Sequence, residues 1–472
     1  MRLLVTIATA ECRLLLRRRS TWLLFAFFAT LVITAGGLSR VRQVREQAQQ
    51  AGYQRLVREQ WESQPDRHPH RVSHYGTFAF KPRGPLAAFD PGVESYAGRV
   101  KYLEAHRQNA ANFPEAAALS SASRLGELSP AFVWQWVLPL VIIALGYRLQ
   151  AGEAESGRLR LLLAQGVPPR TLVLGKLAGL AAALLPFLAV GLVAGALVLG
   201  SADASDGQLG ARLAVLAGAL ALHTTGWITF TLWVSTRART EGQAFAILLS
   251  AWLAFCVVIP RAAAAAAAAR YPLPGKTEFN AAIAAEIHRL GDTHKSDDPL
   301  FAALKADTLA KYGASELKDL PVNYGAMVMA RGEELSAAAF SRHFAALEIK
   351  FAAQNAFVQR AVWLDPVLAL RALSTAASGT DFRAQGKFQR DAEAFRYEFV
   401  QHLNALHRDK IKSTGDGDQR LTAAHWREFA DFRATPLPLG EALGGTAACW
   451  AALAVWTLIP LLALTFIRTL RP

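Results

Sequence analysis

Cysteine is scarce in this 472-residue chain, which contains only three, at Cys12, Cys256 and Cys449. None of them lies in the two long polar stretches of the sequence, and no CxxC or Cys/His spacing of a zinc site occurs. A disulfide framework and a cysteine-based zinc site are therefore excluded as sources of stability. The polar stretches must fold through side-chain packing alone.

Catalytic signatures are also missing. The GKT run at residues 275–277 resembles the end of a phosphate-binding loop, but Arg270 stands where GxxxxGK[ST] requires its first glycine. No HExxH or G-x-S-x-G pattern of a protease or lipase occurs. We therefore expect no enzymatic activity, no cofactor and no ATP site of its own, so that any nucleotide chemistry belongs to a partner.

Long hydrophobic runs are abundant. One covers residues 21–38, four lie within residues 131–260, and one covers residues 446–467. Each is close to the roughly 20 apolar residues that cross a bilayer core. The sequence predicts an all-α integral membrane protein with six transmembrane helices and two large extracytoplasmic insertions, the second mostly helical. The first run is too long for the core of a signal peptide, so we expect a retained anchor.

The expected segments follow the chain in a simple order. They are an interfacial amphipathic helix (1–20), transmembrane helix 1 (21–38), the first insertion (39–130), transmembrane helices 2–5 (131–260) with a connecting segment at 149–170, the second insertion (261–436), and transmembrane helix 6 with a tail (437–472). The first 20 residues place arginines on one helical face and leucines on the other, which suits the membrane interface. Residues 74–92 are expected to form short strands or an irregular loop because Gly and Pro interrupt them.

The formal net charge of +14 is concentrated near the membrane. Both insertions are nearly balanced, whereas the short connections and the two ends are basic. The basic residues are Arg17, Arg18, Arg19, Arg148, Arg158, Arg160, Arg170, Lys176, Arg237, Arg239, Arg468 and Arg471. The remaining short connection carries Asp203 and Asp206 instead. By the positive-inside rule, both termini are cytoplasmic and both insertions are outside, in a multi-pass protein of the cytoplasmic (inner) membrane. This distribution argues against nucleic-acid binding.

Histidines at two places in the sequence form candidate sites. His223 lies near the middle of the fourth hydrophobic run, where an ionisable side chain is a functional candidate, although a neutral histidine bonded to a neighbouring helix is the other interpretation. His68, His70 and His74, with His106 later in the same insertion, have a spacing that could bind copper or zinc. Surface histidines without a metal remain the alternative.

The segment after the second hydrophobic run has an unusual composition. It combines the carboxylates Glu153 and Glu155 with Arg158, Arg160 and an apolar patch that includes Leu159 and Leu162. A short charged helix that presents these leucines beside paired charges would suit docking onto another protein. A solvated charged loop is the competing interpretation.

Several runs resemble those of a known family, the permease subunits of type-2 ATP-binding-cassette (ABC) transporters. Residues 153–176, EAESGRLRLLLAQGVPPRTLVLGK, are similar to the family's E-x-E-x-G-x-L-x-x-L-L-x-x-P-V-x-R segment, with Gly166 in place of its proline and one extra residue before Arg170. The run ECRLLLRRRSTW resembles its interfacial entry helix. The runs HYGTFAFKPRGPLAAFDPGVESYAG, PVNYGAMVMARGEE and SGTDFRAQGKFQRDAEAFRYEFVQHLN resemble a subgroup with a large extracytoplasmic domain of unknown function.

The resemblance implies a subunit that pairs with a second permease, in a homo- or heterodimer, and with cytoplasmic ABC ATPase subunits that bind the ATP. It also implies that residues 149–170 act as a coupling helix, in which Glu153, Glu155, Arg158 and Leu162 contact the ATPase, with Arg160 beside them. A membrane-anchored receptor or assembly scaffold with extracytoplasmic binding domains is the alternative function. It would need neither four clustered spans nor a docking helix.

Overall fold

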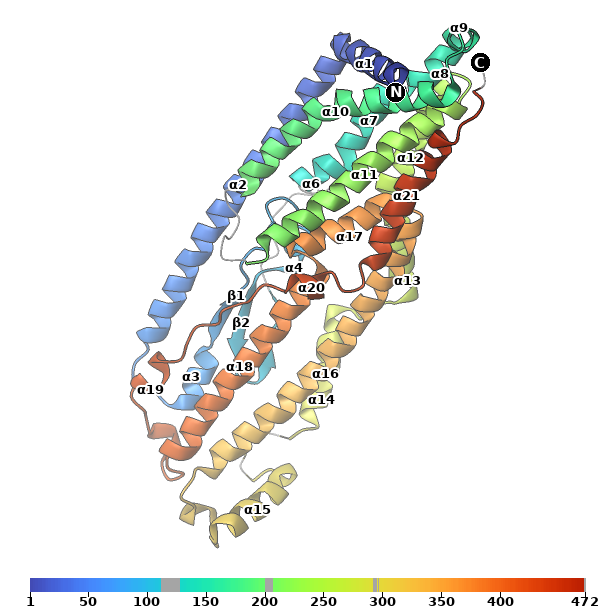
Figure 1. Ribbon diagram of the computed structural model, residues 1–472. Helices are drawn as coiled ribbons and strands as arrows, with labels where there is room; N and C mark the ends of the chain where they lie inside the picture. Colours follow the sequence, from blue (N-terminus) through green and yellow to red (C-terminus); the bar gives the residue numbers. More distant parts are fainter. Residues whose placement is uncertain (112–127, 200–206, 292–294, 296, 471–472) are drawn as a thin grey trace.

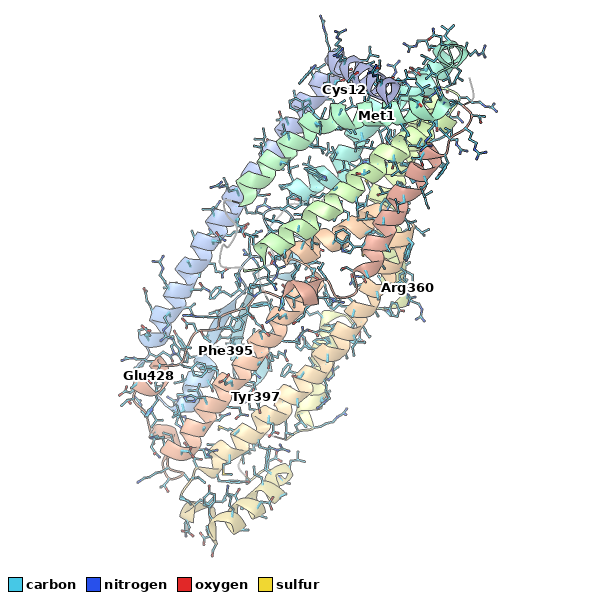
Figure 2. All side chains as sticks on the ribbon, viewed as in Figure 1. Met1, Cys12, Arg360, Phe395, Tyr397 and Glu428 are labelled. Carbon is cyan, nitrogen blue, oxygen red and sulfur yellow. The ribbon has the colours of Figure 1, made fainter. Side chains whose placement is uncertain are left out.

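The computed structural model describes residues 1–111, 128–199, 207–291, 295 and 297–470. It is an elongated and mostly helical molecule (Figure 1). Both termini lie at one end, which we call the basic end, and the helices of the two insertions extend toward the other, the insertion end. Met1 and Cys12 mark the basic end in Figure 2, and Glu428 lies far from them. The acidic connection with Asp203 and Asp206 lies outside the described residues.

Six helices are long and apolar enough to cross a membrane, which confirms the predicted number of spans. Two of them contain a π-helical segment. The spans are α2 (Arg19–Glu62); α6 (Pro130–Phe132), η2 (Val133–Val137), α7 (Leu138–Gly146) and α8 (Arg148–Glu155); α10 (Pro169–Leu199); α11 (Leu209–Arg237); α12 (Glu241–Leu253), η3 (Ala254–Val258) and α13 (Ile259–Arg270); and α21 (Ala447–Thr465).

The first span does not stop at the membrane surface. Helix α2 has 44 residues and is therefore about 66 Å long, more than twice the thickness of a bilayer core. Its polar second half projects into the insertion end, where the indole Nε1 of Trp61 donates to the carbonyl oxygen of Trp426 at 2.8 Å. One continuous helix thus connects the bundle to the far end of the insertions.

The N-terminal amphipathic helix α1 (Arg2–Arg17) packs against the protein with its apolar face. It lies on α10, where Gly175 and Gly179 allow the two backbones to approach closely. A Cβ atom at Gly179 would lie 2.8 Å from the carbonyl oxygen of Ala8, so a side chain there would push the helices apart. The helix ends at Arg18, where the chain is extended, and the hydroxyl of Thr21 donates to the carbonyl oxygen of Leu15 at 2.7 Å.

The first insertion contains a small sheet within the mostly helical protein, and the first strand lies where short strands or an irregular loop were expected. Strand β1 (Thr77–Phe80) pairs antiparallel with β2 (Val100–Glu104), which pairs with β3 (Arg107–Gln108). Short helices flank it, α3 (Pro69–Tyr75) and α4 (Glu94–Ala97). Strand β1 forms where Gly and Pro break the helical pattern and Phe alternates with smaller residues.

The second insertion is mostly helical, as the sequence predicts. Its elements are α14 (Lys276–His288), η4 (Pro299–Phe301), α15 (Ala302–Tyr312), η5 (Leu317–Asp319), α16 (Tyr324–Arg360), η6 (Ala361–Trp363), α17 (Pro366–Ser378), α18 (Phe382–Lys410), η7 (Asp416–Asp418) and α19 (Ala424–Arg427). Helix α20 (Leu439–Ala442) lies between this insertion and the sixth span. The two insertions share one core, because Trp61 and Val72 of the first pack with Phe399, Leu403 and Trp426 of the second. They therefore form a single folded unit.

Helix α17 is the part of the second insertion that enters the bundle (Figure 1). It packs against α11 and α21, and its Leu370 and Leu373 share a core cluster with Ala219 and Leu453 of those spans. The apolar run around Leu370 is too short to cross a bilayer. Its burial between spans explains why the run is apolar.

Candidate functional site

Helix α9 (Arg158–Ala164) stands at the basic end of the molecule, next to α8 (Figure 1). Gly157 separates the two helices and has a φ of 72°, a left-handed conformation that favours glycine. Leu159 is only 1% exposed and anchors α9 to the membrane core cluster, whereas Leu161 is 65% exposed. Arg158 and Arg160 are exposed beside it. We call Arg158, Arg160 and Leu161 the α9 surface.

The leucines of this segment do not have the predicted arrangement. The expectation that Leu159 faces a partner is wrong, because its side chain is buried against the bundle. Leu162 is half-buried and packs on the same core cluster. In a helix of this length, residues three positions apart share a face, so Leu159 and Leu162 face the bundle together while Leu161 points away from it.

Glu153 takes part in a charge cluster inside the chain. Its Oε1 lies 2.8 Å from the Nζ of Lys176, which also donates to the Oε1 of Glu11 at 2.5 Å. The Lys176 side chain is 1% exposed. The cluster joins α8, α10 and α1. In the sequence, Lys176 is one of several basic residues near the membrane. Its position within an apolar run is the one local sign that it needs a carboxylate partner.

Glu155 and its surroundings connect the same segment to α12. The backbone N–H of Glu241, in the first turn of α12, donates to the Oε2 of Glu155 at 2.8 Å. Arg148 forms an ion pair with the Glu241 carboxylate at 2.9 Å. A carboxylate at a helix N-terminus satisfies free N–H groups and interacts favourably with the helix dipole. The segment is therefore attached to the bundle at two separate points.

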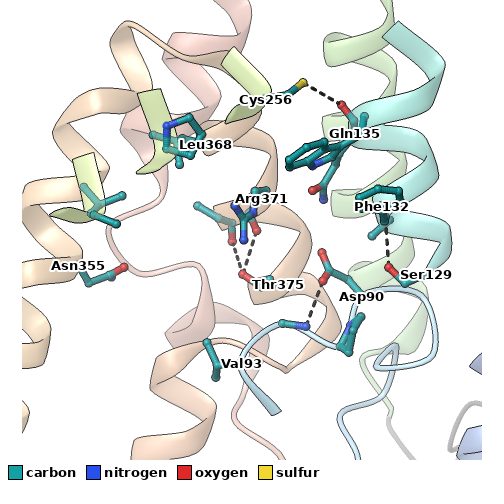
Figure 3. A pocket seen from close by; sticks show the side chains of 18 of the residues that line it. Asp90, Val93, Ser129, Phe132, Gln135, Cys256, Asn355, Leu368, Arg371 and Thr375 are labelled. Atoms are coloured by element: carbon teal, nitrogen blue, oxygen red, sulfur yellow. Dashed lines mark hydrogen bonds between the residues drawn. The ribbon is translucent and has the colours of Figure 1, made fainter. Parts of the chain in front are cut away.

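A cavity of about 610 Å³ lies at the insertion end of the bundle (Figure 3). Its wall contains both π-helical segments of the spans, η2 and η3, and parts of α16 and α17. The π-segments also contact each other, since the thiol of Cys256 in η3 lies 3.9 Å from the carbonyl oxygen of Gln135 in η2. π-Helical turns inside α-helices occur frequently at functional sites, because they redirect side chains and backbone groups.

The cavity is lined by both polar and apolar side chains. Asp90 accepts from the hydroxyl of Ser374 at 2.6 Å and from the backbone N–H of Gly92 at 3.1 Å. Burial raises the pKa of Asp90, and the hydrogen bond from Ser374 partly opposes this. Arg371 lines the same cavity, and its side chain is exposed there. A carboxyl and a guanidinium in one cavity suit the binding of a polar molecule.

Sequence analysis did not find this site. Its residues come from segments that are far apart in the chain, and no local pattern connects Asp90, Gln135 and Arg371. Cys256 also lines the cavity, and its sulfur is buried 3.9 Å from the carbonyl oxygen of Gln135.

His223 is buried in α11, with 2% of its surface exposed. Its ring makes an edge-on contact with Trp227, and neither ring nitrogen has a hydrogen-bond partner among the described residues. The neighbouring Thr224 accepts from the indole of Trp134 at 3.3 Å. His223 does not line the cavity described above. His223 remains a candidate functional residue only because it lies near the middle of a span.

The histidines of the first insertion divide into two groups. His68 turns toward His407 and Asp416 of the second insertion, whereas His70, His74 and His106 come together. The predicted cluster of His68, His70 and His74 is therefore not one site.

Asp365 gives the fold a pH dependence that can be measured. Its Oδ1 caps α17 by accepting from the backbone N–H of Val367 at 2.8 Å, and its buried Oδ2 has no hydrogen-bond partner among the described residues. Burial raises the pKa of Asp365 to about 7. Between about pH 4 and 7, the folded chain then binds more protons than the unfolded chain, so stability falls as the pH rises.

We expect Asp365→Asn to remove this contribution, because asparagine caps a helix equally well and does not ionise. The pKa difference corresponds to roughly 4 kcal/mol at most. Unfolding of the purified chain in detergent at pH 5 and pH 8 measures it, and the wild-type chain should lose more stability between these values than the variant. Equal losses in the two proteins would contradict the assignment.

Comparison with known proteins adds one finding. A family model described as a domain of unknown function (DUF3526) matches residues 276–435, about a third of the chain. The match begins at the first residue of α14 and includes α16 and α17, which form part of the cavity wall. No curated protein matches the chain. The chain is therefore a mostly helical protein with six candidate membrane spans that carries a domain of unknown function.

Proposed function

We propose that this chain is the membrane-spanning permease subunit of a type-2 ABC transporter, which moves a substrate across the cytoplasmic membrane with ATP hydrolysed by a separate subunit. The observation that carries the proposal is the α9 surface. It exposes Leu161 near Arg158 and Arg160 at the basic end, within the segment whose sequence resembles a coupling helix. An exposed apolar side chain flanked by charges is typical of a protein interface.

The contacts of this segment support a mechanical role. A partner that pushes on α9 would act on α10 and α1 through the Glu153–Lys176 pair. It would also act on α12 through Glu155 and Glu241. Helix α12 continues into η3, which lines the cavity. Closure of two ATPase subunits could thus change the shape of the cavity, provided that the bundle has two states of similar free energy.

The orientation follows from the charges. The basic end carries Arg17, Arg148, Arg170 and Arg237, so we place it in the cytoplasm, with the insertions outside. The cavity then lies toward the outer side of the membrane. A type-2 permease pairs with a second permease, identical or different, and we expect the same of this chain. A receptor or assembly scaffold is the alternative, and the large insertions are compatible with it.

The test is co-purification from native membranes. The full chain, tagged at its C-terminus, should retain a soluble protein with a complete phosphate-binding loop when it is extracted in a mild detergent. The chain alone should not hydrolyse ATP, because Arg270 replaces the first loop glycine, and the complex should hydrolyse it faster than the partner alone. A chain that retains no ATPase in repeated extractions would favour the receptor or scaffold.

A further inference from the structure

Two histidines of the first insertion lie one turn apart on α3. His70 and His74 are four positions apart in the chain, which places them on the same face of the helix. Their Nε2 atoms are 3.1 Å apart. Two nitrogen ligands of one tetrahedral zinc ion are about 3.3 Å apart, given Zn–N bonds of 2.0–2.1 Å. The pair thus already has nearly the separation that a shared metal ion requires.

The third histidine approaches from the β2–β3 turn. His106 has a φ of 60°, the one non-glycine residue with a positive φ in the described part of the chain. Its ring centroid lies 5.3 Å from that of His74 and 5.7 Å from that of His70. One ring nitrogen from each of the three histidines can be chosen so that all lie within 4.8 Å of one another. A non-glycine residue in this conformation is held there by its surroundings, and such residues cluster at functional sites.

A buried carboxylate holds His106 in place. Glu333 on α16 accepts from the backbone N–H of His106 at 2.8 Å, and its Oε2 lies 3.3 Å from the ring Nδ1. The guanidinium of Arg396 pairs with the other oxygen of this carboxylate, with 2.6 Å between Nη1 and Oε1. An ionised carboxylate on Nδ1 orients the ring and strengthens Nε2 as a ligand, as in many zinc sites.

From this geometry we infer that His70, His74 and His106 bind a divalent transition-metal ion of the class that imidazole favours, Zn²⁺ or Cu²⁺. His74 is exposed and the other two rings are half-buried, so an ion can reach the site from solution. Three imidazole ligands leave a fourth position for water. The site joins α3 and the β2–β3 turn to α16 through Glu333, and it therefore connects the two insertions. The inference does not depend on the proposed transport function.

The second histidine group has a different character. The Oδ1 of Asp416 lies 2.9 Å from the Nε2 atoms of both His68 and His407. The Nδ1 of His68 accepts from the backbone N–H of His70 at 3.2 Å, so its Nε2 carries the proton that is donated to Asp416. Both rings are buried. We assign this group to the packing between the insertions, where hydrogen bonds already use the nitrogens of His68.

Metal binding by the purified full chain in detergent tests the inference. Competition between the chain and a chromophoric chelator for Zn²⁺ should give one site per chain. Loss of a partner in the second shell of a metal site typically lowers affinity 10–100-fold, so loss of a ligand should lower it at least about tenfold. We expect this loss of Zn²⁺ affinity in His74→Ala, which alters an exposed side chain. We also expect it in His106→Asn, since asparagine tolerates a positive φ.

His402→Ala is the matched control, because His402 is an exposed histidine of the same insertions outside the group. It should leave the affinity unchanged. With Cu²⁺ as the probe, the electron paramagnetic resonance spectrum should show nitrogen ligands that decrease in number in both variants. Wild-type affinity in the His74→Ala/His106→Asn double variant would overturn the inference. So would a site that is lost in His68→Asn but kept in that double variant.

Discussion

Lys176→Met is expected to lower the free energy of unfolding by about 3–5 kcal/mol, because it leaves Glu11 and Glu153 without the cation that compensates them. Lys176 has almost no solvent exposure and contacts both carboxylates within 2.8 Å. Methionine keeps most of the volume of lysine, so the loss would come from charge and not from a cavity. Helix α1 should separate from α10, since Glu11 is its charged contact with that span.

Native cysteines make this separation measurable. Cys12 is half-buried on the face of α1 that packs on the bundle, whereas Cys256 and Cys449 are buried. Thiol labelling at Cys12 should therefore become faster in Lys176→Met while the two buried thiols remain slow. The triple variant Lys176→Met/Glu11→Gln/Glu153→Gln should recover most of the stability, because no buried charge is left uncompensated. A triple variant as unstable as the single one would show that packing, and not charge, explains the loss.

Arg160→Glu combined with Leu161→Ser is expected to abolish association with the proposed ATPase subunit while leaving folding intact. Both side chains are exposed, so the change removes no contact within the chain. Truncating one partner of an interfacial charge pair costs about 2–5 kcal/mol, which corresponds to a loss of affinity of roughly 30-fold to several thousand-fold. Co-purification and the ATPase rate of the complex measure the effect, and an exposed loop without a partner predicts no change.

The control variant reproduces the same chemistry at the insertion end. Leu300 is 62% exposed and Lys305 is exposed nearby, so Leu300→Ser/Lys305→Glu should leave ATPase binding unchanged. Reversal of Glu153 and Glu155 would be a less specific test, because both residues are bonded within the chain. Normal stimulation of ATP hydrolysis by the α9 variant would disprove the coupling role.

Local patterns in the sequence were sufficient to predict the membrane part of the fold. A bilayer core requires about 20 consecutive apolar residues in every spanning helix, and this requirement is visible without knowing what the helices contact. The amphipathic pattern of residues 1–17 and the helical character of the second insertion are local in the same sense. The Gly- and Pro-interrupted run around Phe78 likewise indicated short strands or an irregular loop, and β1 forms there.

The candidate sites were decided by contacts between distant segments. Lys176 pairs with Glu11, which is 165 positions away in the chain, and His106 donates to Glu333, which is 227 positions away. The cavity joins Asp90 to the hydroxyl of Ser374, 284 positions away. No periodicity records such pairs, because a helix or strand pattern specifies which face is buried but not which neighbour covers it. The charged segment before α10 was visible in the sequence, yet only packing determined that Leu159 is buried and that Leu161 is exposed.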